Sequence, residues 1–240
     1  WIFILTISEY SIYYLPPFDF RPYHVGADIR KAMEIPEDAE QPQFETTFIL
    51  EKNGVQKEFT INDYPDSTWT LIDSRTVQLT QGYQPEISDF SVVTVEDGID
   101  ITEQIIEDSG YTFLLVAPHL ENADDSNLDL INQVHDYARE KGYPFYCLTA
   151  GGEKGIRQWT LMTGAEYAYC HTDEIVLKTI VRSNPGLVLL KNGTIIGKWG
   201  KNELPVIEEN TDRLENLPLG TITEKPVEQK ILIILMWFAL

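Results

Sequence analysis

A nearly continuous apolar run at residues 111–117, YTFLLVA, constrains the fold of this chain more than any other segment. A strand without alternating polar residues is typical of a sheet that helices cover on both faces. A second buried strand is expected at Phe145–Thr149. Between the two, residues 127–141 carry apolar side chains at helical spacing, and Gly142 follows as a stop signal. The succession of strand, helix and strand predicts an α/β layered domain.

Further elements extend this pattern from residue 85 to residue 205. Strands are expected at residues 90–95, 99–101 and 167–170, and helices at residues 101–107, 153–162 and 173–182. A closing hairpin is expected at residues 187–190 and 194–199, around Asn192-Gly193, because both residue types tolerate the positive φ of a tight hairpin turn.

The N-terminal part of the chain has a different pattern, which indicates β structure. Residues 44–51 and 55–61 flank Asn53-Gly54, a strong hairpin signal, and short strands are expected at residues 69–72 and 76–79. We therefore predict three parts. Residues 1–84 form a β-rich region, which the membrane interpretation given below would make membrane-proximal, residues 85–205 form the α/β domain, and residues 206–240 form an acidic linker with an apolar end.

The charge of the chain argues against nucleic-acid binding. Asp and Glu number 38 against 18 Lys and Arg, which gives a formal net charge of −20 in 240 residues. Such a surface repels phosphate backbones, and the sequence has no basic patch with interleaved aromatic residues.

Both ends of the chain are strongly apolar. The last ten residues read ILIILMWFAL, and the first eighteen read WIFILTISEYSIYYLPPF. A bilayer-spanning helix needs about 20 residues, so each run is too short by itself. Two interpretations remain open at this point: the ends are stubs of transmembrane helices, or they pack as a strand or helix of a soluble core.

The order of elements resembles the redoxin branch of the thioredoxin superfamily. The similarity rests on Ile87-Ser88-Asp89-Phe90, Asp97-Gly98, the apolar strand YTFLLVA, Ser183-Asn184-Pro185-Gly186 and the closing LLKNGTIIGKWG. It implies a thioredoxin-like sheet flanked by helices, with Pro185 in a cis peptide bond and its loop facing the active-site helix.

One departure from that family bears directly on function. Its reactive cysteine lies where the first long strand meets the next helix, so that the helix N-terminus stabilises a thiolate. Here residues 118–125 read PHLENADD and contain no cysteine. Standard thioredoxin or peroxiredoxin catalysis is therefore not expected. His119 and Glu121 occupy this loop instead, either as an acid/base pair or, as we favour, as a solvated loop.

A narrower resemblance concerns LPPFDFRPYHVG, YPFYCLTA and RSNPGLVLLKNGTIIGKW, which are similar to the extracytoplasmic region of DoxX-related membrane proteins of Bacteroidetes. It implies transmembrane helices ending before Leu15 and starting at Ile231, a location in the cell inner membrane, and a domain that faces the periplasm. It also implies an association with protein partners in envelope redox processes.

Cys147 and Cys170 are the two cysteines of the chain, and three interpretations of them stay open. They form a reversible redox pair, a structural disulfide between neighbouring strands, or two buried thiols. The structural interpretations are favoured because neither cysteine lies at an expected helix N-terminus. The sequence has no cofactor or metal motif, and the glycine-rich residues 151–155 lack the Lys-Ser/Thr of a phosphate-binding loop.

The function expected first is therefore a membrane-tethered, non-catalytic thioredoxin-like module that binds partners. An accessory subunit of a redox complex comes second, and a thiol-disulfide oxidoreductase acting through Cys147 and Cys170 comes third. A fold alone does not decide between them, because function depends on the site.

Overall fold

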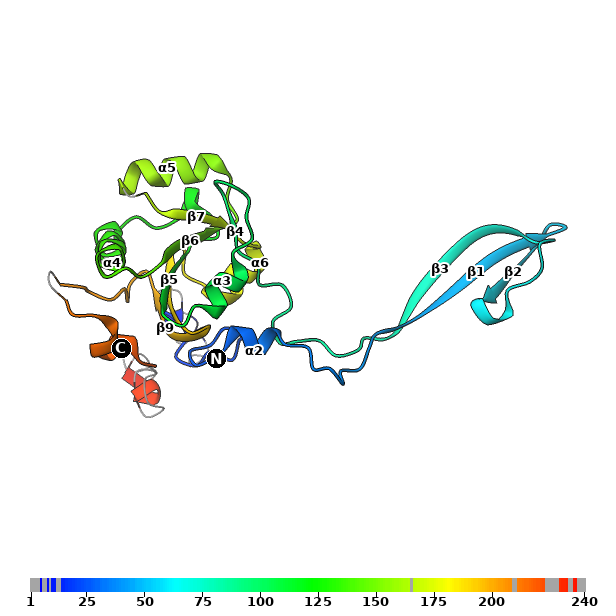
Figure 1. Cartoon of the computed structure of the whole chain (residues 1–240), viewed down its shortest axis with the longest axis horizontal. Helices are drawn as coiled ribbons and strands as arrows, with labels where there is room; N and C mark the ends of the chain where they lie inside the picture. The colour runs from blue at the N-terminus through cyan, green and yellow to red at the C-terminus, as the bar shows by residue number, and fades with distance from the viewer. Residues whose placement is uncertain are drawn as a thin grey trace. The chain divides into compact units, whose positions relative to one another are not determined.

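The computed structural model describes residues 5, 8, 10, 11, 14–164, 166–208, 211–222, 229–232, 235 and 236. The chain divides into two compact units (Figure 1). The smaller unit is Glu34–Glu86, and the larger one combines Trp1–Met33 with Ile87–Leu240. The sequence-based division at residues 84/85 and 205/206 differs from this one and stays a prediction.

A six-stranded sheet forms the centre of the larger unit, in the order β4-β7-β6-β5-β8-β9. Strands β5, β6 and β7 are parallel, whereas β4, β8 and β9 are each antiparallel to their neighbours. The strands are β4 (Val93–Thr94), β5 (Tyr111–Val116), β6 (Phe145–Thr149), β7 (Ala168–His171), β8 (Gly186–Lys191) and β9 (Thr194–Gly200).

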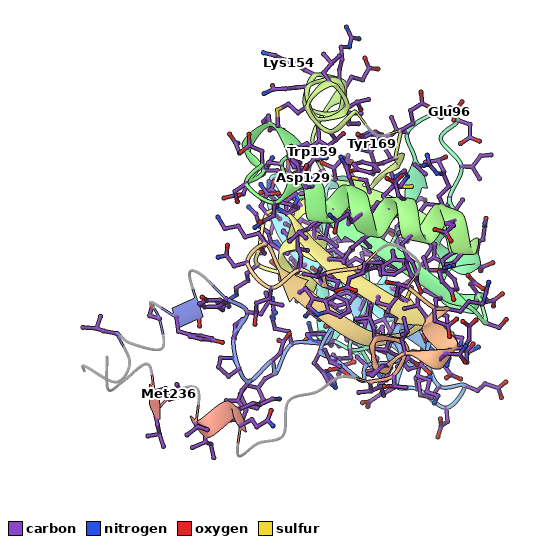
Figure 2. The ribbon with its side chains drawn as sticks, turned by 90° about the vertical axis from the view of Figure 1, so that its left-hand side faces the viewer. Glu96, Asp129, Lys154, Trp159, Tyr169 and Met236 are labelled. Carbon is purple, nitrogen blue, oxygen red and sulfur yellow. The ribbon has the colours of Figure 1, made fainter. Side chains whose placement is uncertain are left out.

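Helices cover both faces of this sheet, as the apolar β5 predicts. Helices α4 (Leu128–Lys141) and α5 (Glu153–Thr163) share one core with Phe113 and Leu115. Helices α2 (Ile29–Met33), α3 (Thr102–Glu107) and α6 (Glu174–Ile180) share the other core with Leu114 and Val116. Figure 2 shows Trp159 on the inner side of α5 and Lys154 on its outer side. The predicted α/β fold class, a thioredoxin-like sheet flanked by helices with a β-rich N-terminal region, is confirmed.

The strands expected at residues 90–95 and 99–101 are shorter than predicted. Only Val93–Thr94 forms a strand, and the second segment contributes a single bridge between Val93 and Asp100. Phe90 and Val92 are buried without joining a ladder. Their apolar side chains fill the core beside α3, and this burial produced the strand-like sequence pattern.

The segment before α2 is held to the sheet by a buried ion pair. The ammonium group of Lys198, on β9, lies 2.7 Å from Asp19 Oδ2 and donates to the carbonyl oxygen of Tyr23 at 2.8 Å. Arg21 adds two hydrogen bonds to the same carboxylate, at 2.7 and 2.8 Å. The side chain of Lys198 is only 3% exposed, so Asp19 supplies the charge that balances it.

Residues 204–222, which the sequence predicts to be mostly linker, form instead a strap that packs on the α4 side of the sheet. Its residues 209 and 210 lie outside the described part. The strap buries Leu204, Ile207 and Leu214 in the core and contains two short 3-10 turns, η3 (Leu214–Asn216) and η4 (Pro218–Gly220).

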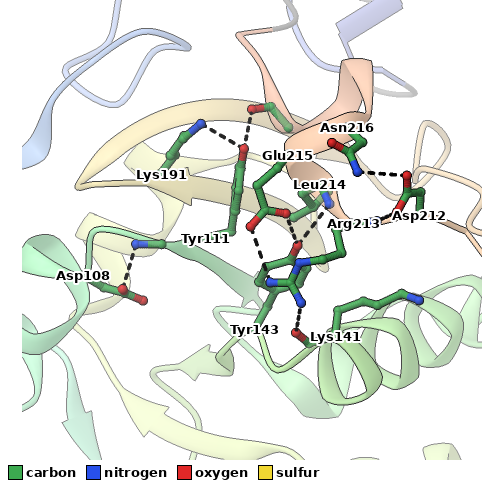
Figure 3. A network of polar contacts seen from close by, with 12 residues as sticks. Asp108, Tyr111, Lys141, Tyr143, Lys191, Asp212, Arg213, Leu214, Glu215 and Asn216 are labelled. Atoms are coloured by element: carbon green, nitrogen blue, oxygen red, sulfur yellow. Dashed lines mark hydrogen bonds and ion pairs between the residues drawn. The ribbon is translucent and has the colours of Figure 1, made fainter.

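Tyrosine hydroxyl groups fasten the strap to the domain (Figure 3). The main-chain contacts are Tyr137 Oη to Asp212 O (2.6 Å), Leu214 N to Tyr143 Oη (3.0 Å) and Tyr111 Oη to Gly220 O (3.0 Å). Tyr143 also donates to Glu215 Oε2 at 2.7 Å, and Arg213 lies over the Tyr143 ring. The strap is thus a packed part of the layer that α4 and α5 form on this face of the sheet.

The smaller unit is a three-stranded antiparallel sheet in the order β2-β1-β3. Strands β1 (Gln43–Lys52) and β2 (Val55–Thr60) form the predicted hairpin, with positive φ at Asn53 and Gly54. The two short strands expected at residues 69–72 and 76–79 are one continuous strand, β3 (Thr70–Thr80), because residues 73–75 also pair with β1.

A small aromatic cluster stabilises one end of this sheet. The rings of Phe48 and Tyr64 lie 5.1 Å apart, those of Phe59 and Trp69 lie 5.0 Å apart, and Leu50 is buried at 1% exposure. The loop that contains the 3-10 turn η1 (Ile61–Asp63) supplies Tyr64 and Trp69. This gives the sheet a core of its own.

The predicted transmembrane helices are not found. The apolar ends, residues 1–14 and 231–240, lie partly outside the described residues. Among the residues that are described, no helix has both the length and the apolar character needed to cross a bilayer. The prediction that the chain contributes its own membrane helices, and the inner-membrane location inferred from it, are therefore wrong for this part of the chain.

Candidate functional site

Several loops meet beyond the carboxyl ends of β5 and β6 because of the strand directions in the large sheet; "this edge" below means that side of the sheet and not an edge strand. Strands β5 and β6 are parallel, so their carboxyl ends lie at the same edge, and β8 starts there because it runs antiparallel to β5. The loops are bonded to one another at this edge: Ala150 N donates to Pro118 O at 3.2 Å, and Thr172 N donates to Thr149 O at 3.1 Å. In open α/β sheets ligands bind at this kind of edge.

His119 lies at this edge between two carboxylates. Its Nδ1 atom is 3.4 Å from Glu121 Oε1, and its Nε2 atom is 3.1 Å from Glu174 Oε1. The His119 side chain is 35% exposed, and the two glutamates are somewhat more exposed. Hydrogen bonds and charge from Lys178, together with a hydrogen bond from His119, lower the pKa of Glu174. We call His119, Glu121 and Glu174 the carboxylate site.

The loop around Pro185 lies against the loop that carries His119. The Asn184-Pro185 bond is cis. Asn184 Nδ2 donates to the His119 carbonyl oxygen at 2.9 Å, and Asp124 N donates to the Asn184 carbonyl oxygen at 2.9 Å. Asp124 also forms an ion pair with Lys201. The structure therefore brings His119, Glu121 and the Pro185 loop together at one edge.

Two buried polar atoms near this edge are unsatisfied. Thr172 Oγ1 and Asn184 Oδ1 have no hydrogen-bond partner within the described part of the chain. Buried polar atoms in folded proteins almost always have a partner, either protein or water. Both atoms are shielded from solvent, so the partner that such atoms usually have would be a buried water molecule.

Two glycines make room for the Glu121 carboxylate. A Cβ atom would lie 3.1 Å from Glu121 Oε2 at Gly151 and 2.8 Å from it at Gly155. The carboxylate therefore lies at the N-terminal end of α5, where Gly152 provides no side-chain cap. A negative charge at this position is favoured by the exposed N–H groups and the helix dipole.

Replacing Gly155 with alanine should displace this carboxylate without unfolding the domain. The new methyl group would meet the mobile end of Glu121, and alanine is the better helix former by up to about 1 kcal/mol. We expect the free energy of unfolding to change by about 1 kcal/mol or less, while the Glu121–His119 contact is lost. Urea denaturation together with the NMR shifts of the His119 ring checks this, and unchanged His119 shifts would contradict it.

The structure does not join Cys147 and Cys170, and both are free thiols. Cys147 pairs with Tyr169 across β6 and β7, whereas Cys170 pairs with Leu148. Because side chains alternate between the faces of a sheet, this offset of one residue places the two sulfur atoms in different cores. The disulfide considered from the sequence is therefore not formed.

Neither cysteine has the surroundings of a reactive thiol. Both side chains are 0% exposed, one on each face of the sheet. Burial raises the pKa of Cys170 to about 11 and raises the pKa of Cys147 further. The thiolate, which is the nucleophile and the metal ligand, is thus strongly disfavoured at both positions.

Sequence reasoning located part of this site and missed the rest. It placed His119, Glu121 and Pro185 in the relevant loops, but it did not identify Glu174 or Asn184 as their neighbours. The glycines at residues 151–155 were a usable signal, since closely spaced glycines often mark a close approach of another group. Among the described residues, no cluster of three or more His, Cys, Asp or Glu side chains is suited to hold a metal ion.

Comparisons with known proteins give limited matches. The model of a domain of unknown function, DUF8463, matches residues 44–81, which lie within the smaller unit. No curated protein matches the chain.

Two solved structures are similar in part. An uncharacterized conserved protein from Geobacillus kaustophilus has 13% identity and a TM-score of 0.35, covering 50% of this chain and 72% of its own. A putative protein disulfide isomerase from Bacteroides thetaiotaomicron has 12% identity and a TM-score of 0.34, covering 46% of this chain and 73% of its own.

Proposed function

We propose that this chain is a thioredoxin-like binding module that works without a redox-active thiol and contacts its partner at the carboxylate site. One observation carries the proposal. The loop in which the resembled family has its reactive cysteine holds His119 and Glu121 here, while both thiols of the chain lie in separate cores. The loops at the carboxyl ends of β5 and β6 therefore offer a partner charged groups that form hydrogen bonds, in place of a reactive thiol.

The chemistry of the site favours a basic partner. Glu121 and Glu174 are each more than 40% exposed, so their oxygens can accept further hydrogen bonds from a partner. Arg and Lys side chains are the donors that carboxylates bind most strongly. A segment rich in Lys or Arg therefore fits, and the net charge of −20 would attract it from a distance.

The alternative interpretation, a thiol-disulfide oxidoreductase acting through Cys147 and Cys170, has no support in the geometry. A redox pair must alternate between two thiols and one disulfide, and two cysteines on adjacent strands can form that disulfide only if their side chains point to the same face of the sheet. Cys147 and Cys170 point to opposite faces. The narrower resemblance to DoxX-related proteins stays a prediction, and so does the accessory role in a redox system that it implies. The proposal made here does not depend on either.

Binding of a fluorescent oligolysine peptide to the full chain, measured by anisotropy, tests the proposal. Replacing Glu121 and Glu174 together with glutamine should weaken binding about fivefold or more, because exposed ion pairs contribute up to about 1 kcal/mol each. The matched control is Glu45→Gln with Glu58→Gln, which removes the same charge from exposed positions of the smaller unit. Equal losses in both double variants would show attraction by net charge alone, and this result, or no binding at all, would refute the proposal.

A further inference from the structure

Strand β3 of the smaller unit has an open edge. β3 pairs with β1 on one side, and within residues 34–86, all of which are described, no strand pairs with its other side. All eleven residues of β3 are exposed. Its apolar side chains are each about half exposed, between 49% and 57%, at Leu71, Ile72, Val77 and Leu79.

This edge lacks most of the features that prevent strands from associating. Natural edge strands are usually short or carry Lys or Pro residues. β3 is eleven residues long and contains neither, whereas the other edge strand, β2, has six residues and includes Lys57. Register shifts against β1 occur around Ile72 and Leu79, so the regular part of β3 is residues 73–78.

The charges of β3 match those of a second β3 strand in the opposite direction. The strand has one acidic residue, Asp73, and one basic residue, Arg75, on either side of Ser74. If two copies pair antiparallel with Ser74 opposite Ser74, each Asp73 lies directly opposite the Arg75 of the other copy. Opposite charges at such positions stabilise a pair of strands, and like charges destabilise it. Parallel pairing in register would instead place Asp73 beside Asp73.

The backbone at the centre of this arrangement is also available. Ser74 N donates at 2.8 Å to the carboxylate of its neighbour Asp73, a local contact within the strand. In a pair of strands, Asp73 can turn to the opposite Arg75 while the Ser74 N–H and C=O groups serve the second strand. One pairing step thus gives the main-chain groups of Ser74 and the charged groups of Asp73 and Arg75 partners on the second strand.

We propose that two copies of this chain associate antiparallel through β3, with Ser74 at the two-fold axis and Asp73 opposite Arg75 twice. The pairing extends each three-stranded sheet into a sheet of six strands. A sheet edge that recognises another strand in this way derives its affinity from main-chain hydrogen bonds and its specificity from the side chains at alternate positions. The occupant of this edge is a second copy because the charge pattern is complementary to itself.

Sedimentation velocity of the full chain over a range of concentrations tests this proposal. Asp73→Arg and Arg75→Asp should each weaken dimerisation by about tenfold or more, because two opposite-charge pairs become two like-charge pairs. Glu58→Arg and Lys57→Asp on β2 are controls with the same changes of charge and should leave dimerisation unchanged.

A mixture distinguishes the proposed pairing from a general effect of charge. The Asp73→Arg chain has a doubly basic strand and the Arg75→Asp chain a doubly acidic one, so the two should form a heterodimer although neither pairs well with itself. The double variant, Asp73→Arg with Arg75→Asp, should again form a homodimer. A chain that is monomeric at every concentration, or a dimer that is insensitive to these substitutions, would overturn the proposal.

Discussion

Replacing Leu214 with alanine should lower the free energy of unfolding of the larger unit by about 2–5 kcal/mol, the range found for buried leucines. Leu214 is 0% exposed and belongs to the core that α4 shares with the sheet. The alanine variant keeps the hydrogen bond from residue 214 N to Tyr143 Oη but leaves a cavity where the side chain was. Urea denaturation followed by circular dichroism measures the loss.

Val206→Ala is the matched control for this experiment. Val206 lies in the same strap but is 70% exposed, so its truncation should change the free energy of unfolding by about 0.5 kcal/mol or less. If both variants lose the same small amount, the strap is not a packed part of the domain. A large difference between them confirms that residues 204–222 stabilise the domain and are not a linker.

Replacing Asp19 with alanine should cost about 3–5 kcal/mol, because it leaves the buried ammonium group of Lys198 without a compensating charge. Of the partners found in the described part of the chain, the carbonyl oxygen of Tyr23 would be the one left within hydrogen-bonding distance. The double variant, Asp19→Ala with Lys198→Met, removes both charges and should recover a good part of this loss. If the double variant is no more stable than Asp19→Ala, Lys198 is not the source of the penalty.

The effect of Asp19→Ala should also depend on pH. Burial raises the pKa of Asp19, but hydrogen bonds and charge from Arg21 and Lys198 outweigh burial and lower it to about 2. An unfolded aspartate has a pKa of about 4. A lowered pKa means that the stabilisation is complete above about pH 4 and is lost as the pH falls to about 2. The stability difference between Asp19→Ala and the unmodified chain should therefore shrink over this interval, and a constant difference would contradict the assignment.

The sequence predicted those parts of the fold that depend on local patterns. The apolar run in β5, the stop at Gly142 and the Asn53-Gly54 and Asn192-Gly193 turns all correspond to observed elements, with positive φ at each turn residue. The strap was missed because its buried apolar side chains, Leu204, Ile207 and Leu214, have neither helical nor strand spacing. Burial there depends on contacts with tyrosines of distant elements.

The candidate site was predicted only in part for a similar reason. His119 and Glu121 are close in sequence, and their loop follows directly from the end of β5. Glu174 joins them only through the parallel order of β5, β6 and β7. The fate of the two cysteines depends on the register between β6 and β7, since a shift of one residue moves a side chain to the other face. Composition and spacing do not determine that register.

Alkylation of the full chain with iodoacetamide, followed by mass spectrometry, tests most directly the claim that this thioredoxin-like fold has no redox-active thiol. Without denaturant, and with or without reductant, the account predicts that neither Cys147 nor Cys170 is modified, because both are fully buried. In guanidinium chloride both should be modified without prior reduction. Modification of either cysteine in the folded chain, or a need for reductant after unfolding, would contradict the account and make the oxidoreductase interpretation the leading one.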